Sequence, residues 1–207
     1  MRAFWLDQLL TLCRLAPIWE TVATDFANEP NVIVAKVDAE AENAKATAQD
    51  QGVKSYPTIK FFPKGSKVAE PYEGGRTEQD LVKFLNEKAG THRTPGGGLD
   101  AKAGLVDALD ALVEKFTVGA TITEVLAEAS KFIEESKNQA QIGYAKYYVK
   151  VFSKQSENEG YAAKELARLD KILKRGGLAP AKLDEFTGKT NILRKFVEKV
   201  IPGKSEL

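Results

Sequence analysis

Residues 51–62, QGVKSYPTIKFF, place a proline directly before a short apolar run. Because proline has no N–H to give to a sheet ladder, Pro57 is expected at the first residue of a strand or at a sheet edge. X–Pro bonds lose most of the usual trans preference, yet only about 5–6% of them are cis in folded proteins. A cis bond would turn the backbone of Tyr56 outward and leave its N–H and C=O unpaired; the alternative is a rigid turn before a strand.

The residues around this stretch indicate an α/β arrangement. The run Val32–Val37 is apolar almost throughout, which predicts a strand covered by helices on both faces. Residues 41–49 contain good helix formers with little apolar surface, so we expect an outer helix there. Lys64-Gly65 predicts a hairpin connection. Thr77 is the expected N-cap of the next helix, with Asp80 three residues further on.

This order of elements, with the segments KVDA, GVKSYPTIKFF, YEGGRT and LVKFLN, resembles the thioredoxin-like catalytic domain of the protein disulfide-isomerase family. The text LAPIWETVATDF, residues 15–26, resembles the helix that follows that family's active-site Cys-Gly-His-Cys. The match covers roughly the last three quarters of such a domain. It implies a partial thioredoxin-like domain over residues 1–90, truncated at its N-terminal side, with the central strand and the Cys-x-x-Cys missing.

The first residues do not resemble the missing strand, and its loss would leave apolar strand edges unpaired and prone to aggregation. Three explanations stay open: the start rearranges to fill the gap, the domain is marginally stable, or the written sequence lacks an upstream part. Arg2 and the apolar run 3–12 are superficially like a signal peptide. Asp7 and Gln8 interrupt that run and no small-residue cleavage site follows, so we expect a helix that continues through residues 15–26.

The second half of the chain has a different composition. Residues 91–98, THRTPGGG, predict a domain linker, and we assign no role to its histidine, His92. Across residues 99–207 apolar residues recur at helical spacing in successive stripes, which predicts a helical bundle. Its order and length resemble the small helical C-terminal domain of some disulfide-isomerase relatives of the endoplasmic reticulum. The predicted fold class is therefore an incomplete α/β thioredoxin-like domain followed by an all-α bundle.

The composition excludes several classes of function. A net charge of +1 provides no basic field for nucleic acid. No segment approaches the roughly 18 apolar residues that span a bilayer. The single cysteine, Cys13, permits neither an internal disulfide nor a cysteine-based metal cluster. We expect no cofactor and no metal.

The last four residues are Lys204, Ser205, Glu206 and Leu207. They resemble the Lys-Asp-Glu-Leu retention address, with serine in place of aspartate. The alternative is an ordinary charged tail. Beside a disulfide-isomerase-like domain, the resemblance implies the lumen of the endoplasmic reticulum and a retention receptor as partner.

Family members exchange disulfides with two thiols at a helix N-terminus, where one attacks and the other resolves the mixed disulfide. Cys13 lies two residues before Leu15, whereas the family's second cysteine lies three before the equivalent leucine, so Cys13 is out of register and is only a weak catalytic candidate. If a helix starts near it, the dipole and Arg14 would lower its pKa. A lone thiol still could not resolve a mixed disulfide. The alternative is a small apolar residue packed in the N-terminal segment.

Other positions match the family residue by residue. Tyr56 and Pro57 match the segment where a cis proline faces the cysteines and the preceding backbone binds extended substrate. Arg76 matches a loop arginine that tunes the pKa of the resolving cysteine; the alternative is a solvated loop arginine. Pro17 matches the proline that kinks the active-site helix.

Two functional hypotheses follow. The first is a disulfide isomerase acting in thiol-disulfide exchange and the folding of secretory proteins, whose redox dithiol is missing from this sequence. The second is a redox-inactive chaperone or binding module that holds unfolded polypeptides at the Tyr56–Pro57 face and the helical domain. Unfolded or disulfide-containing polypeptides are the expected partners in both. A purely structural interaction protein, based on the bundle alone, is a third possibility.

Overall fold

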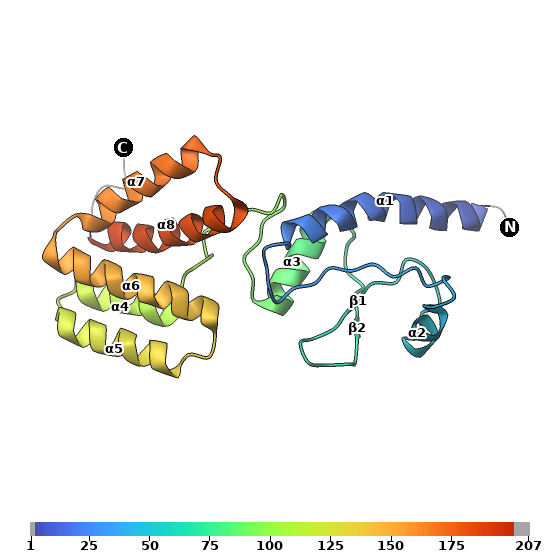
Figure 1. Ribbon diagram of the computed structural model, residues 1–207, viewed down its shortest axis with the longest axis horizontal. Helices are drawn as coiled ribbons and strands as arrows, with labels where there is room; N and C mark the ends of the chain where they lie inside the picture. Colours follow the sequence, from blue (N-terminus) through green and yellow to red (C-terminus); the bar gives the residue numbers. More distant parts are fainter. Residues whose placement is uncertain (1–2, 201–207) are drawn as a thin grey trace. The chain divides into compact units, whose positions relative to one another are not determined.

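The computed structural model describes the main chain of residues 3–200 and the side chains of residues 14–138 and 141–199. The chain divides into two compact units, Met1–Gly98 and Leu99–Leu207 (Figure 1). No helix within the described residues is both long and apolar enough to cross a membrane. The same residues contain no group of three or more His, Cys, Asp or Glu side chains that could hold a metal ion.

The first unit contains α1 (Ala3–Asp25), α2 (Lys45–Asp50), β1 (Lys60–Phe61), β2 (Glu70–Pro71) and α3 (Glu78–Ala89). Helix α1 confirms the expectation of a helix that begins near the N-terminus and continues through residues 15–26, except that it ends one residue earlier, at Asp25. The helix passes through Pro17 although proline cannot donate a helical hydrogen bond. One turn later the hydroxyl of Thr21 donates to the carbonyl of Pro17 at 3.0 Å.

Helix α3 confirms the expected N-cap at Thr77. Its hydroxyl accepts from the N–H of Asp80, and the Asp80 carboxylate accepts in return from the N–H of Thr77, which satisfies two N–H groups that the first turn leaves unpaired. The helix ends at Gly90, whose φ of 66° is in the left-handed region. Its buried face meets α1 in a small apolar core formed by Leu15, Val22, Phe26, Leu81 and Val82.

The prediction of a strand at residues 32–37 is wrong, because this segment pairs with no neighbouring strand in the described part of the chain. The described sheet has two strands only, β1 and β2, which pair antiparallel. The side chains of Val32 and Val34 pack against the small core, but Ile33 is 89% exposed, so the segment is not covered on both faces. A β-strand needs main-chain hydrogen bonds to a neighbouring strand. Among the described residues, no other segment makes such bonds to residues 33–37. The outer helix expected at 41–49 forms as the shorter α2, which has no buried residue.

Residues 91–98, expected as a linker, are fastened to the first unit by side chains. Asn86 accepts from the N–H of Arg93 at 2.9 Å and donates to its carbonyl at 2.7 Å. Arg93 is 4% exposed and also donates to the carbonyl of Gly97 at 2.9 Å. The N–H of Gly96 donates to Glu78 in the first turn of α3 at 2.8 Å. This segment is therefore part of the packing of the first unit.

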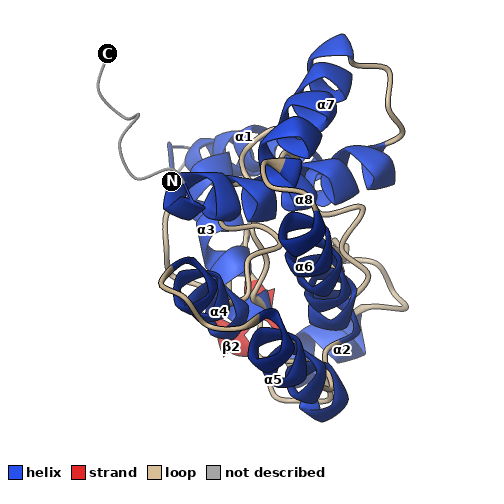
Figure 2. Cartoon of the chain, turned by 90° about the vertical axis from the view of Figure 1, so that its left-hand side faces the viewer, coloured by secondary structure: helices blue, strands red, loops and turns tan. Residues whose placement is uncertain are grey.

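The second unit is a helical bundle, as predicted from its apolar stripes. It contains α4 (Asp107–Thr117), α5 (Ile122–Glu135), α6 (Gln139–Glu157), α7 (Tyr161–Arg175) and α8 (Pro180–Val200). Helix α5 packs beside both α4 and α6, and α7 packs beside α8 (Figure 2). The fully buried Phe152 stands at the centre, with the ring centroids of Phe116 and Phe196 at 5.6 and 4.8 Å.

Small residues permit a close approach between α8 and the turn that precedes α4. A Cβ on Gly104 would lie 2.9 Å from the Cα of Gly188, and a Cβ on Gly188 would lie 2.5 Å from the ring of Tyr144. The amide of Asn191 donates to the carbonyls of Asp100 and Ala103 at 2.9 and 3.0 Å. The glycine contact and this amide together fix the turn against α8.

Candidate functional site

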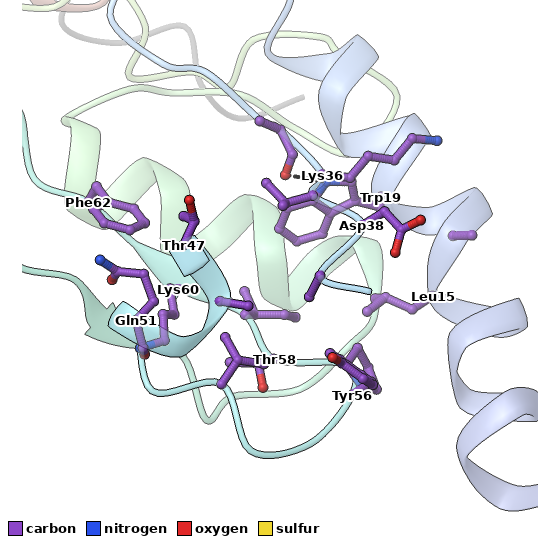
Figure 3. A pocket seen from close by; sticks show the side chains of 18 residues that line it. Leu15, Trp19, Lys36, Asp38, Thr47, Gln51, Tyr56, Thr58, Lys60 and Phe62 are labelled. Carbon is purple, nitrogen blue, oxygen red and sulfur yellow. Dashed lines mark hydrogen bonds between the residues drawn. The ribbon is translucent and has the colours of Figure 1, made fainter. Parts of the chain in front are cut away.

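The first unit contains a groove of about 680 Å³. Its walls come from α1 at residues 15–19, the extended segment 35–39, α2 with the following turn at 47–53, and residues 56–62. In Figure 3, Leu15 and Trp19 come from α1, and Gln51, Lys60 and Phe62 gather on the opposite side of the view. Most of the lining side chains are apolar, and those described include neither cysteine nor histidine. The groove is therefore suited to binding an apolar group rather than to covalent chemistry.

One wall of the groove is the segment 35–39, which two side chains of α1 hold in place. The indole Nε1 of Trp19 donates to the carbonyl of Ala35 at 3.2 Å (Figure 3), and Lys36 pairs with Glu20 of α1 at 3.1 Å. Within the described residues, the main chain of residues 33–37 makes no hydrogen bond to the main chain of another segment. Val37 on this segment lines the groove and is 68% exposed. The segment thus contributes an exposed apolar side chain to the groove, and its carbonyl at Ala35 is bound by Trp19.

The facing wall includes β1, which is hydrogen-bonded to β2 along one edge only in the described sheet. The N–H of Tyr72 donates to the carbonyl of Ile59 at 3.0 Å, and Lys60 lies opposite Pro71 in the register. Because bonded and non-bonded pairs alternate along an antiparallel ladder, the main-chain N–H and C=O of Lys60 point away from β2. Pro71, which has no N–H, fits the non-bonded position. Lys60 also lines the groove, so the second edge of β1 belongs to this wall.

The predicted substrate-binding pair lies on the groove wall. The Tyr56–Pro57 peptide bond is cis, and both residues line the groove. Tyr56 is 38% exposed. The hydroxyl of Thr58 donates to the carbonyl of Ser55 at 2.6 Å and closes the bend that contains the pair. Their role in binding substrate stays a prediction.

The structure does not bring the other predicted positions to this groove. Cys13 lies inside α1, whose first residue is Ala3, so the condition of a helix start beside Cys13 is not met and this position gains no N-terminal dipole. The side chain of Cys13 and residues Lys204, Ser205, Glu206 and Leu207 lie outside the described part. Arg76 is exposed in the loop before α3 and is absent from the described lining of the groove.

The groove itself was not predicted from the sequence. Val37 was expected in a strand covered on both faces, because a run of apolar residues has the same pattern whether its neighbours are present or absent. Trp19 was not singled out either, although its indole donates to the carbonyl of Ala35 on the same wall. One expectation could have predicted the groove. The strand that would lie between residues 32–37 and the strand after Pro57 is missing from this sequence, and its absence leaves a gap the width of one strand.

A second cluster that the sequence did not reveal surrounds Asp25 at the end of α1. Asp25 is 4% exposed, and its Oδ2 has no hydrogen-bond partner among the described atoms. Burial raises the pKa of Asp25, and the nearby Glu78 carboxylate raises this pKa further. Gly97 lies close beside Asp25, so the cluster lies under the fastened segment 91–98. The expected effect of this buried carboxylate is on stability.

Comparison with known proteins supports the division of the chain. Residues 11–87 match the family model described as thioredoxin. Residues 104–196 match the family model described as endoplasmic reticulum protein ERp29, C-terminal domain. The fold is thus a thioredoxin domain, with only a two-stranded sheet in its described part, followed by a helical ERp29 C-terminal domain.

The curated relatives carry protein disulfide-isomerase names. The chain is 60% identical over 192 residues to protein disulfide-isomerase erp38 of Neurospora crassa, which covers 93% of this chain and 52% of the relative. It is 56% identical over 193 residues to protein disulfide-isomerase tigA of Aspergillus niger, with the same two coverages. It is 43% identical over 185 residues to a probable protein disulfide-isomerase A6 of Medicago sativa, covering 88% and 50%. The chain spans about half the length of the curated relatives it matches.

Proposed function

Because this chain belongs to the protein disulfide-isomerase family over the half of its relatives' length that it spans, we propose that it binds unfolded polypeptides without exchanging their disulfides. The observation that carries the proposal is the apolar groove beside Tyr56 and Pro57. The groove has the volume of a typical ligand pocket, and most of its lining side chains are apolar. Such a surface suits an extended apolar chain.

The lack of a dithiol supports the redox-inactive form of this proposal. Exchange requires one thiolate to attack and a second thiol to release the mixed disulfide. The sequence contains one cysteine, so a mixed disulfide at Cys13 would not be resolved within the chain. Cys13 also lies within a helix rather than at its start, where the dipole would stabilise a thiolate.

The names of the relatives favour a second function, thiol-disulfide exchange during the folding of secretory proteins. That function needs a Cys-x-x-Cys joined to this chain. The intact mass of the protein from its native source separates the two functions. A mass near 22.7 kDa supports the redox-inactive function, and a mass larger by a thioredoxin-like segment supports exchange.

The place of action in this proposal is the lumen of the endoplasmic reticulum. Support comes from the ERp29-type domain, the names of the relatives, and the tail Lys204-Ser205-Glu206-Leu207, which would bind a retention receptor. The test targets the chain to the secretory pathway with a fused signal sequence and measures its appearance in the medium. Removal of the four tail residues should increase secretion, and equal secretion with and without them would contradict the role of the tail.

The binding function is tested with the full chain and a reduced, carboxymethylated polypeptide, which has no free thiol and cannot fold. We expect saturable binding measured by fluorescence anisotropy. Val37→Asp, in the groove, should weaken binding about tenfold because it places a charge on the apolar wall. The matched control is Val68→Asp, since Val68 is 76% exposed but does not line the groove. Equal loss in both variants, or no binding by the unmodified chain, would contradict the proposal.

A further inference from the structure

We propose that residues 91–98 act as a proton-sensitive strap at the end of α1. A proton held between the carboxyl groups of Asp25 and Glu78 keeps this segment closed, and its loss opens the segment while the helices of the first unit stay folded. The second unit begins at Leu99, directly after the strap. Opening would therefore give the two units a flexible, Gly-rich connection. The inference does not depend on the groove or on the function proposed for it.

The first argument is a contact between two carboxyl groups. Asp25 is 4% exposed and lies within hydrogen-bonding reach of Glu78, which belongs to the first turn of α3. An ionised carboxylate can only accept, so this contact becomes a hydrogen bond when one of the two groups is protonated. Oδ2 of Asp25 has no hydrogen-bond partner among the described atoms, so a proton on that oxygen displaces no existing bond.

The second argument is that the strap rests on the same two residues. The N–H of Gly96 donates to Oε1 of Glu78 at 2.8 Å, and a Cβ added to Gly97 would lie 3.3 Å from the Cα of Asp25. The φ of Gly97 is 75°, in the left-handed region that glycine adopts without strain. Repulsion between the two carboxylates therefore acts directly under the main chain of the strap.

The third argument is the balance of charges around Asp25. Burial and the carboxylate of Glu78 raise the pKa of Asp25, and together they outweigh the N–H of Gly96 and the guanidinium of Arg93, which lower it. Arg93 is also engaged by Glu29. A raised pKa in the closed state means that the closed strap binds the proton more tightly than the open one. The strap is therefore held most firmly below the ordinary pKa of an aspartate and loosens as pH rises through the raised pKa.

The experiment measures the exchange of the Gly96 amide with water by NMR in the full chain between pH 4.5 and pH 7.5. Exchange is expressed as a protection factor, so that the intrinsic pH dependence of amide exchange cancels. We expect the protection of Gly96 to fall at least about fivefold as pH rises, with the midpoint at which the carboxyl carbon of Asp25 titrates. The amide of Leu85, inside α3, should keep its protection. Constant protection at Gly96, or a parallel loss at Leu85, would overturn the proposal.

Two variants of unchanged shape should hold the strap closed at every pH. Asp25→Asn and Glu78→Gln each remove the repulsion and supply an amide donor for the contact. In both, we expect the protection of Gly96 to stay within about twofold of its value at low pH. The matched control is Glu87→Gln, an exposed position of the same helix, which should keep the pH dependence of the unmodified chain. Retention of that dependence in either of the first two variants would overturn the proposal.

His92 is the other titratable group of the strap and needs its own control. Histidine ordinarily changes charge between pH 5 and pH 8, and His92 directly precedes Arg93. His92→Gln should leave both the midpoint and the size of the change at Gly96 as they are in the unmodified chain. Disappearance of the change in His92→Gln would assign it to the histidine and overturn the role of Asp25.

Discussion

Arg93 donates from Nε to Oε1 of Glu29 at 2.7 Å, which joins residues 64 positions apart in an ion pair whose arginine side chain is 3% exposed. The same guanidinium donates through Nη1 to the carbonyl of Gly97. Buried charges need both a partner and satisfied donors. This ion pair therefore fastens the Gly-rich segment 91–98 to the turn that follows α1.

Replacing Arg93 with methionine should destabilise the first unit by about 3 kcal/mol, because it leaves Glu29 without its partner. Urea unfolding followed by tryptophan fluorescence measures the effect, since both tryptophans, Trp5 and Trp19, belong to the first unit. The control is Arg168→Met, which breaks an ion pair whose arginine is 56% exposed and should cost under about 1 kcal/mol in unfolding followed by circular dichroism. A loss at Arg93 no larger than the control would contradict the fastening role.

Asp25→Asn should stabilise the first unit at pH 7 by about 1 kcal/mol, since it removes a poorly partnered buried carboxylate beside Glu78. The folded pKa of Asp25 is raised, mainly by burial, above its unfolded value. The folded protein therefore binds the proton more tightly, and stability falls as pH rises from the unfolded pKa through the folded one. The variant should lose this part of the pH dependence. Glu73→Gln, in an exposed loop, should retain it.

Thr77→Ala should cost the first unit about 1 kcal/mol, because the capping box with Asp80 is lost at the start of α3. Thr77→Ser keeps the hydroxyl, so its loss of stability should be less than half that of Thr77→Ala. Thermal and urea unfolding of the two variants measure the difference. Equal stability of the alanine and serine variants would show that the cap contributes nothing.

Two glycine-to-alanine changes in neighbouring helices should have opposite signs. Alanine is favoured over glycine inside a helix by roughly 0.5–1 kcal/mol. Gly143→Ala in α6 should show this gain, because a Cβ there meets nothing within 4 Å. Gly188→Ala in α8 should destabilise the bundle by about 1–3 kcal/mol, since its Cβ would overlap the ring of Tyr144. Thermal unfolding by circular dichroism compares them, and a gain at Gly188 would contradict the close approach.

The full chain should fail to reduce insulin disulfides catalytically when a thiol reductant recycles it. One cysteine permits a mixed disulfide and no resolution, so at most one event per chain is expected. The turbidity of precipitating insulin chains measures turnover. Sustained turnover that disappears in Cys13→Ser would refute this expectation.

The helical half of the protein could be predicted closely from the sequence. Apolar residues such as Leu109 and Leu112 mark the face of α4 that is buried, because helical spacing depends only on residues within the same turn or the next. The box of Thr77 and Asp80 could be found for the same reason, since the partners are three residues apart. Thr121 and Glu124 form the same box at the start of α5, although the sequence analysis did not single them out.

The sequence alone determined the apolar faces of the bundle helices, the cap at Thr77 and the single cysteine, since each of these is a property of neighbouring residues or of composition. The family followed from the resemblance of motifs such as GVKSYPTIKFF. Only the tertiary structure decided that Ile33 and Val37 are exposed, that Tyr56–Pro57 is cis, and that Arg93 is buried against Glu29. Strand pairing, a groove and an ion pair across 64 positions depend on which distant segments meet. The apolar pattern of a segment does not show whether the neighbouring strand that would pair with it is present.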